Sequence, residues 1–128
     1  MIHDEICTYE VAKLAKEKGF NEYEACNHVY EDDKQWYTLT AYTNAKGIDW
    51  SKDQFTVAPT QSLLQRWLRE EKGIAIVLQP YSYNIQRSVY TYIYEIWASN
   101  NLEKTSKSFK TYELALEDAL KYTLENLI

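Results

Sequence analysis

Apolar residues recur with the 3.6-residue period of an α-helix in three segments of the chain. In the last segment Tyr112, Ala115, Leu116 and Ala119 share one face, and Glu113 suits the positive end of a helix dipole. Each of the first two segments is followed by a glycine, the residue that most easily adopts the left-handed conformation in which many helices end. The pattern therefore predicts helices over Ile6–Lys18, Thr60–Lys72 and Thr111–Leu127.

Between these helices, β-branched and aromatic residues gather in short runs bounded by polar turns, a pattern typical of strands joined by hairpins. Pro80 falls inside one run. Because proline cannot donate a ladder hydrogen bond, it predicts an edge strand or a bulge at that point. The segment 44–59 has no sustained period and is predicted to be a long loop. The predicted strands are Ala25–Glu31, Gln35–Thr43, Ile74–Tyr83 and Val89–Ala98, with Leu102–Phe109 as a candidate for one more.

This order of elements, α-β-β-α-β-β-α, predicts an α+β protein whose antiparallel sheet is built from hairpins and covered by three helices. The length of 128 residues favours a single domain spanning 1–128, and only three Gly and two Pro exclude a collagen-like chain. The 12 Tyr, 4 Trp and 3 Phe supply the apolar area that a core needs, which is not typical of intrinsic disorder.

Five of the tyrosines lie in the hairpin predicted over residues 74–98. If Tyr83 stands opposite Ser88, alternation of side chains produces an aliphatic face, directed at the helices, and a tyrosine-rich face directed away from them. The aliphatic face then holds Ile74, Ile76, Leu78, Val89, Thr91, Ile93, Glu95 and Trp97, and the tyrosine-rich face holds Val77, Gln79, Tyr81, Tyr83, Tyr90, Tyr92, Tyr94 and Ile96. A bulge at Pro80 would shift this register by one residue.

The tyrosine-rich face has two interpretations. Tyrosine is an ordinary strand residue that is often half buried with its hydroxyl in water. It also supplies large, rigid contact area at low entropic cost, and it is enriched in recognition surfaces. The binding hypothesis adds one directional charge from an arginine, and its candidate partner-binding residues are Tyr81, Tyr83, Arg87, Tyr90, Tyr92 and Tyr94.

The net charge of −5 is unevenly distributed. Residues 1–33 hold nine acidic residues and three lysines, a net of −6, whereas residues 34–128 hold ten acidic and eleven basic residues, a net of +1. This balance disfavours a dedicated nucleic-acid binder, because phosphate backbones attract basic surfaces.

A local basic stretch nevertheless precedes the last predicted helix, at Lys104, Lys107 and Lys110. With the tyrosine-rich face, it is compatible with single-stranded nucleic-acid binding. The alternative is that these lysines protect an exposed edge or loop from aggregation. The element order over 60–127 is also that of double-stranded RNA-binding domains, but Tyr112 and Glu113 stand where those domains have a basic helix start.

Residue types that carry enzyme chemistry are few and poorly spaced. His3, Cys7, Cys26 and His28 are all the His and Cys of the chain, and their spacing is not a common zinc pattern. On a strand, Cys26 and His28 would lie about 6.6 Å apart, too far for a thiol–imidazole pair. No phosphate-binding, nucleophile-elbow or metalloprotease motif occurs. We therefore predict no metal site, no cofactor and no catalytic residue.

Glu95 is the one acidic residue on the predicted aliphatic face. A carboxyl group buried there would suit an acid or base role. The alternatives are an ion pair with Arg66 or Arg69, or exposure at the sheet edge. A single carboxylate without a partner group makes a poor catalytic site, so the alternatives are favoured.

Three segments resemble small hypothetical proteins of phages, prophages and mobile elements of the Bacteroides group. The segment 58–74 is similar to their APT-x-Q segments, which continue into W-(L/F)-R-E, and 109–120 and 7–12 are similar to other parts of the same proteins. The resemblance implies an intracellular mobile-element protein, and it carries no catalytic residue to transfer. The chain also starts without a basic, apolar leader and has no run of about 18 apolar residues, so we expect a cytoplasmic protein without a membrane span.

Together these observations favour a small accessory protein that is not an enzyme. We expect it to bind another protein, or itself, through the tyrosine-rich face or the 44–59 loop. The alternative is a single-stranded nucleic-acid-binding protein that combines the same face with the three lysines.

Overall fold

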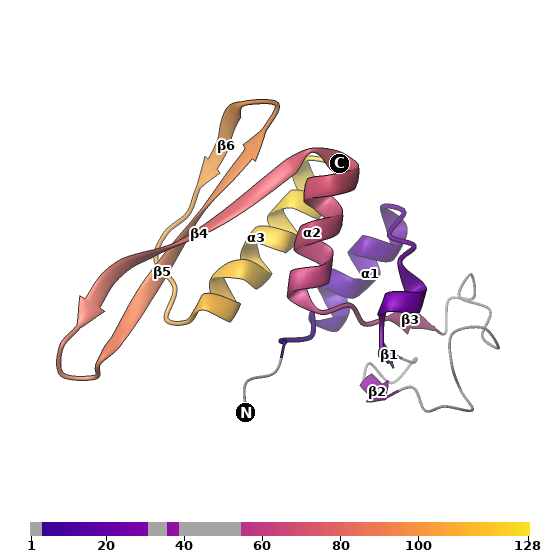
Figure 1. Ribbon diagram of the computed structural model, residues 1–128, viewed down its shortest axis with the longest axis horizontal. Coiled ribbons are helices and arrows are strands. Elements are labelled where there is room, and N and C mark those ends of the chain that lie inside the picture. Colours follow the sequence, from indigo (N-terminus) through magenta and orange to yellow (C-terminus); the bar gives the residue numbers. More distant parts are fainter. Residues whose placement is uncertain (1–3, 31–35, 39–54) are drawn as a thin grey trace. The chain divides into compact units, whose positions relative to one another are not determined.

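The computed structural model describes residues 4–30, 36–38 and 55–128. The chain divides into two compact units, Met1–Thr60 and Gln61–Ile128 (Figure 1). Among the described residues there are three α-helices and two antiparallel sheets, so the protein belongs to the α+β class. The predicted loop 44–59 lies largely outside the described residues, as does His3.

The first unit combines one helix with a small sheet. Thr8 caps the helix, because its hydroxyl oxygen accepts a hydrogen bond from the backbone N–H of Val11 at 3.3 Å. The strands are antiparallel in the order β2-β1-β3. The elements of this unit are α1 (Tyr9–Glu17), a short 3₁₀ helix η1 (Tyr23–Ala25), β1 (His28–Tyr30), β2 (Trp36–Thr38) and β3 (Thr56–Val57).

The core of the first unit is held by Tyr30. Its hydroxyl donates a 2.7 Å hydrogen bond to the backbone carbonyl of Cys7, and its ring packs edge-on against Tyr9 at 5.5 Å. The backbone N–H of Cys7 in turn donates to the carbonyl of Pro59 at 2.9 Å. These contacts join the entry of α1 to β1 and to the segment that leaves β3.

The second unit places two helices on one side of a three-stranded antiparallel sheet in the order β4-β5-β6 (Figure 1). Buried Gln61 links the helices, because its side-chain amide donates to the Glu113 carbonyl and to the Glu117 carboxylate, both at 2.9 Å. The elements of this unit are α2 (Gln61–Lys72), β4 (Ile74–Asn84), β5 (Val89–Ala98), β6 (Asn101–Thr105) and α3 (Tyr112–Asn126). Its core residues are Leu64, Trp67, Leu68, Ile74, Ile76, Tyr94, Ile96, Ala115, Leu116, Ala119, Leu120 and Leu124.

Most of the predicted elements are confirmed. The three helices and the two long strands occur within a few residues of their predicted bounds. The prediction of a loop over 44–59 was wrong at its end, because Thr56 and Val57 form a short strand that pairs with β1. The candidate fifth strand is shorter than predicted and ends at Thr105, although Phe109 forms an isolated bridge with Tyr92.

Pro80 lies on an edge strand and beside a bulge, as predicted. The β4–β5 register changes between Pro80 and Ser82, so Tyr81 is the extra residue. Tyr92, opposite Pro80, exchanges both backbone hydrogen bonds with Phe109, at 2.9 and 2.7 Å. The Tyr92 amide therefore points away from β4, and the nitrogen of Pro80 falls on the free edge, where the missing N–H costs no ladder bond.

The predicted register of this hairpin was wrong by one residue over its first half. Tyr94 stands opposite Leu78, and Ile96 opposite Ile76, so before the bulge the even-numbered residues of β4 and β5 share the helix-facing side. Val89, Thr91, Ile93, Glu95 and Trp97 consequently lie on the other side, not on the predicted aliphatic face. Beyond the bulge, Tyr83 stands opposite Tyr90 instead of the predicted Ser88, a shift of two residues that keeps Tyr83, Tyr90 and Tyr92 on one side. Tyr81, the bulge residue, lies on the other side, which corrects its place in the predicted tyrosine-rich face.

Gly73 terminates α2 in the left-handed conformation, with φ of +67°. A Cβ atom added there meets no heavy atom within 4 Å, so substitution strains only the backbone. We expect Gly73→Ala to lower the free energy of unfolding by about 1–2 kcal/mol, and Gly73→Asn to cost less. Urea unfolding of the three proteins measures this order, and equal stability of all three would contradict it.

Candidate protein-interaction surface

The β4–β5 hairpin extends past the first turn of α3 and ends in a projecting ribbon (Figure 1). Every residue from Pro80 to Tyr90 is exposed, and this segment is called the arm below. β6 pairs only with residues 95–98 of β5, and the bridge from Phe109 reaches Tyr92. The arm therefore begins where the supporting elements stop.

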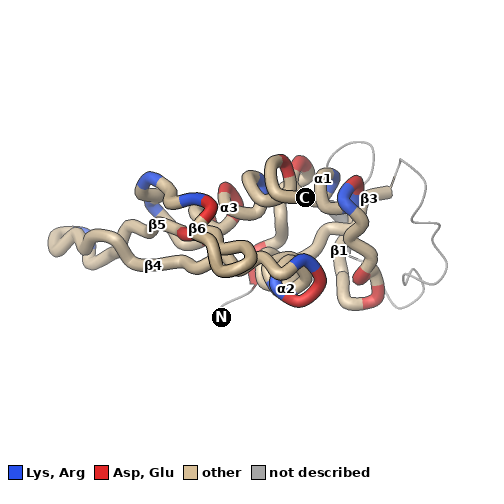
Figure 2. Tube along the Cα trace, turned by 90° about the horizontal axis from the view of Figure 1, so that it is seen from above, with Lys and Arg blue, Asp and Glu red and all other residues tan. Residues whose placement is uncertain are grey.

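The arm is apolar although it is exposed. Five large hydrophobic side chains lie within it: Tyr81, Tyr83, Ile85, Val89 and Tyr90 are 65%, 49%, 82%, 49% and 47% exposed. Arg87 is the only charged residue between Gly73 and Tyr94, and it lies in the turn at the tip. Figure 2 shows the resulting contrast between the nearly uncharged arm and the mixed charges of the helices. An apolar surface of this kind is typical of an interaction site.

A row of four aromatic rings runs from the arm to α3 and is called the tyrosine row below. The ring centroids are 4.8 Å apart for Tyr83 and Tyr90, 6.5 Å for Tyr90 and Tyr92, and 5.7 Å for Tyr92 and Tyr112. Because the Tyr92 amide points away from β4, that of Tyr90 does too, and Tyr83 and Tyr90 form a non-hydrogen-bonded pair, in which side chains approach most closely. The row thus lies on the helix-facing side of the sheet.

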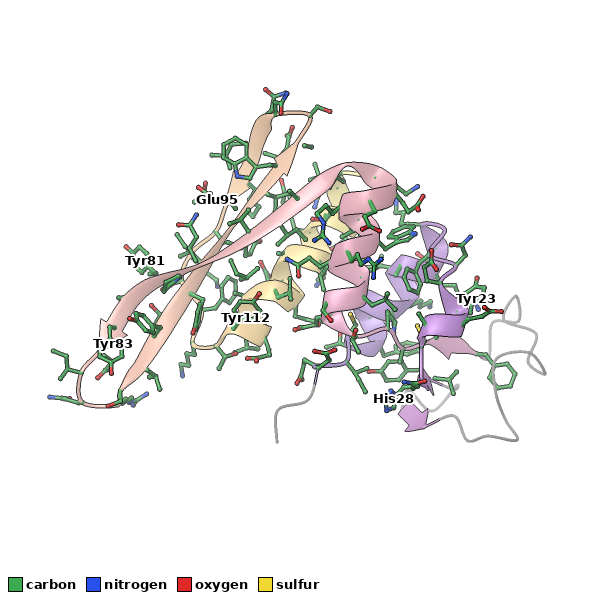
Figure 3. All side chains as sticks on the ribbon, in the orientation of Figure 1. Tyr23, His28, Tyr81, Tyr83, Glu95 and Tyr112 are labelled. Atoms are coloured by element: carbon green, nitrogen blue, oxygen red, sulfur yellow. The ribbon has the colours of Figure 1, made fainter. Side chains whose placement is uncertain are left out.

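The other side of the arm carries Tyr81, which points away from α3 (Figure 3). Next to the bulge, the hydroxyl groups of Ser82 and Thr91 share a 2.7 Å hydrogen bond across the strands. At the tip, the side-chain oxygen of Asn84 accepts a 3.1 Å hydrogen bond from the backbone N–H of Arg87. These two bonds give the ribbon a defined shape although it lacks a core.

Tyr94 does not belong to an exposed face, which corrects its place in the predicted tyrosine-rich face. It is fully buried, its hydroxyl donates a 2.7 Å hydrogen bond to the Asp118 carboxylate, and its ring stacks on Phe109 at 6.1 Å. Its backbone N–H donates to the hydroxyl oxygen of Ser106 at 2.8 Å, and its carbonyl accepts from the backbone N–H of Ser106 at 3.0 Å. Burial, and then the hydrogen bond to Asp118, raise the pKa of Tyr94 well above its ordinary value.

Of the six predicted partner-binding residues, Tyr81, Tyr83, Arg87 and Tyr90 lie in the arm, and Tyr92 is half buried at its base. Tyr112 belongs to the apolar face predicted for the last helix, but it is exposed and extends the tyrosine row. The exposure of Leu114, at 54%, was also missed. Both residues belong to the first turn of α3, where the end of the helix extends past its contacts with the core. In the sequence, only the position of the helix start could have indicated that they are exposed.

The three lysines proposed for nucleic-acid contacts lie on β6 and on the segment that follows it. Lys104 stands 4.6 Å from the ring of Tyr122, and Lys107 stands 5.7 Å from the ring of Phe109. Lys110 is exposed. The unit from 61 to 128 contains eight basic and eight acidic residues, a net of zero, and α3 begins with Tyr112 and Glu113. The second unit therefore has the α-β-β-β-α element order of double-stranded RNA-binding domains, but it lacks the basic start of the last helix that those domains have.

Glu95 lies on the outer side of the sheet, away from α3, which corrects its place on the predicted aliphatic face (Figure 3). Its carboxylate accepts a 2.9 Å hydrogen bond from the side chain of Gln79 and a 3.5 Å one from Trp97. The predicted pair with Arg66 does not form, because Arg66 pairs with Glu70. Glu95 thus acts as a cross-strand acceptor.

The cysteines and His28 belong to the first unit. Cys7 and Cys26 are buried free thiols, and the Cys26 thiol donates to the Glu22 carbonyl at 3.4 Å. Burial lowers the pKa of His28, which lies on β1 beyond η1 (Figure 3). Over the described parts of the chain, no group of three His, Cys, Asp or Glu side chains is arranged to hold a metal ion.

Burial, and then the charge of Glu22, raise the pKa of Cys26 from 9.0 to about 12. The folded protein therefore keeps a proton that the unfolded chain loses above pH 9. The resulting stabilisation is present below pH 9 and is lost as the pH rises toward 12. We expect the stability difference between the wild type and Cys26→Ala to narrow over this interval, as measured by urea unfolding at several pH values. A stability difference that stays constant over this interval would contradict the raised pKa of Cys26.

No family model, curated protein or solved structure matches the chain. Of the helices described, none has the length and apolar character that a membrane crossing requires.

Proposed function

We propose that this protein is a protein-binding module without catalytic activity, and that the arm is its binding element. The proposal depends on one observation: five large apolar side chains are exposed on a ribbon of eleven residues, Pro80–Tyr90, that carries a single charge. The resemblance of the sequence to mobile-element proteins supports an accessory role inside a cell.

The chemistry of the arm suits a protein partner. Tyrosine and arginine are the residues that most often dominate binding energy at protein interfaces. Tyr81, Tyr83 and Tyr90 together expose roughly 240–400 Å², given the area that an aromatic side chain buries. This area is divided between the two sides of the ribbon, because Tyr81 lies on the side opposite Tyr83 and Tyr90, so the arm offers a partner two smaller apolar faces.

The remaining reactive groups favour binding over catalysis. A Cys26 thiol with a pKa of about 12 is protonated at neutral pH, whereas the thiolate is the nucleophile. Glu95 is occupied by Gln79 and Trp97 on an open sheet face. The carboxylate of Glu22 near the thiol raises the pKa of Cys26, so it disfavours the thiolate that a nucleophile needs.

The test is a comparison of three purified, immobilised proteins exposed to extract of the source cell. The arm variant is Tyr81→Ser, Tyr83→Ser and Tyr90→Ser combined, and the control is Leu102→Ser, because Leu102 on β6 is 47% exposed, as Tyr90 is. We expect a protein that the wild type and the control retain and the arm variant loses at least about tenfold, which corresponds to the loss of one or more tyrosine hot spots. Equal retention by all three proteins would overturn the proposal, and so would retention of nothing by a protein that also fails to bind a second copy of itself.

Single-stranded nucleic acid is the alternative ligand. Its test is titration with a labelled oligonucleotide at two salt concentrations, because contacts with phosphates weaken as salt rises. We expect no salt-dependent binding, since Lys104 and Lys107 lie over aromatic rings and the second unit has no net charge. Tight binding that weakens with salt and that Lys107→Glu abolishes would favour the alternative.

A further inference from the structure

We infer that the arm is a dimerisation element, and that its partner is the arm of a second copy of this chain, aligned antiparallel about a two-fold axis. This inference rests on the proposed function and names the partner. In the dimer, the tyrosine rows of the two copies pack against each other, and the tip of each arm contacts the first turn of α3 of the other copy.

The spacing along the arm sets the position of the two-fold axis. Tyr92 is level with the first turn of α3, because its ring contacts Tyr112 at 5.7 Å. The tip begins at Ser88, four residues further along, so the midpoint is Tyr90, with Tyr83 opposite. An axis through this pair is about 7 Å, or two strand residues, from Tyr92 on one side and from the tip on the other. The tip of one copy therefore reaches the first turn of α3 in its partner.

The charges at these two places are complementary. Arg87 is the only charge of the arm, and Glu113 is exposed in the first turn of α3. Within the described chain neither side chain has an ion pair. The antiparallel arrangement brings each Arg87 to the Glu113 of the other copy, and because the interface is isologous the contact forms twice. Apolar groups match as well, since Ile85 at the tip and Leu114 beside Glu113 are both largely exposed.

The small area of the contact limits the strength of the dimer. In each copy the exposed parts of Tyr83, Tyr90 and Tyr112 amount to roughly 200–340 Å². With Ile85 and Leu114 added, the interface remains below the roughly 800 Å² per partner of a standard complex. We therefore expect a reversible dimer with a dissociation constant in the micromolar range, at the weak end for specific interfaces.

The experiment measures sedimentation velocity of the full chain from about 1 to about 100 µM, the range that such an affinity requires. We expect the wild type to pass from monomer to dimer. Arg87→Glu and Glu113→Arg should each weaken the dimer at least about tenfold, because each replaces two ion pairs with two like-charge pairs. An equimolar mixture of the two variants should recover wild-type association, since both contacts between unlike copies are then Arg with Glu.

Two controls separate a specific contact from general effects. Lys110→Glu changes the charge by the same amount at an exposed site outside the arm and should leave the dissociation constant unchanged. Leu102→Ser should also leave it unchanged, because Leu102 lies on β6 outside the arm and has the same exposed fraction as Tyr90, whereas Tyr90→Ser should abolish the dimer. Circular dichroism confirms that each variant is folded.

The outcomes distinguish this inference from the proposed function. A wild type that stays monomeric at the highest concentration overturns the dimer, and the arm then remains a binding element only if a different protein is lost with the arm variant. The antiparallel arrangement is overturned if both charge-reversal variants dimerise with the wild-type dissociation constant. It is also overturned if the mixture of the two variants does not recover wild-type association. Absence of both dimer and partner overturns both proposals.

Discussion

Replacement of Tyr94 by phenylalanine is expected to lower the free energy of unfolding by about 1.5–3 kcal/mol, the contribution of a hydrogen bond to a charged group. The hydroxyl of this buried residue donates to Asp118 at 2.7 Å, and the ring lies between β5 and α3. Tyr94→Ala should cost about 3–5 kcal/mol, because it also leaves a cavity where the ring stacks on Phe109. Urea unfolding of the full chain measures both values.

The matched control is Tyr83→Phe. Tyr83 is on the same side of the same hairpin but is half exposed in the arm, so loss of its hydroxyl should change stability by less than about 0.5 kcal/mol. The raised pKa of Tyr94 adds a pH signature: the folded state keeps the phenol protonated, so this part of its stability is present below pH 10 and declines at higher pH. Equal costs for Tyr94→Phe and Tyr83→Phe would show that the hydrogen bond from Tyr94 to Asp118 does not stabilise the fold.

Leu120→Ala should be similarly severe, at about 2–5 kcal/mol. Leu120 is fully buried on α3, in the layer between the helices and the sheet, and the truncated side chain would leave a cavity that the surrounding residues fill only in part. Thermal and urea unfolding measure the loss.

Leu114→Ala is the control on the same helix. Leu114 is 54% exposed, so its truncation should change stability by less than about 0.5 kcal/mol. In the dimer inferred above, the same substitution should weaken association. A large stability loss for Leu114→Ala, or a negligible one for Leu120→Ala, would contradict the orientation of α3.

Local patterns predicted the elements of this fold, because helix periodicity, glycine stops and β-branched runs act over a few residues. The helix over 112–126, its first turn with Glu113 and the two long strands were all within reach of such patterns. The two-residue strand at Thr56 and Val57 was not, because it exists only through pairing with β1. So short a strand has too few residues to show a period.

The candidate site was predicted in composition but not in orientation. Tyr83, Tyr90 and Tyr92 were correctly grouped on one side of the hairpin. Their side of the sheet was predicted wrongly, because the register depends on where the turn closes, and a shift of one residue exchanges the two faces. The bulge beside Pro80 was anticipated as a cause of such a shift, but a sequence does not show in which half of a hairpin the change occurs.

The sequence by itself determined that this chain is an α+β protein with a tyrosine-rich, nearly uncharged hairpin, because these properties follow from residue types and their periods. Only the tertiary structure decided which of those tyrosines are available. The helices and β6 cover the hairpin as far as Tyr94, the Phe109 bridge ends at Tyr92, and the strands continue beyond both. Exposure is a property of what packs against a strand, and that packing is formed by residues distant in the chain.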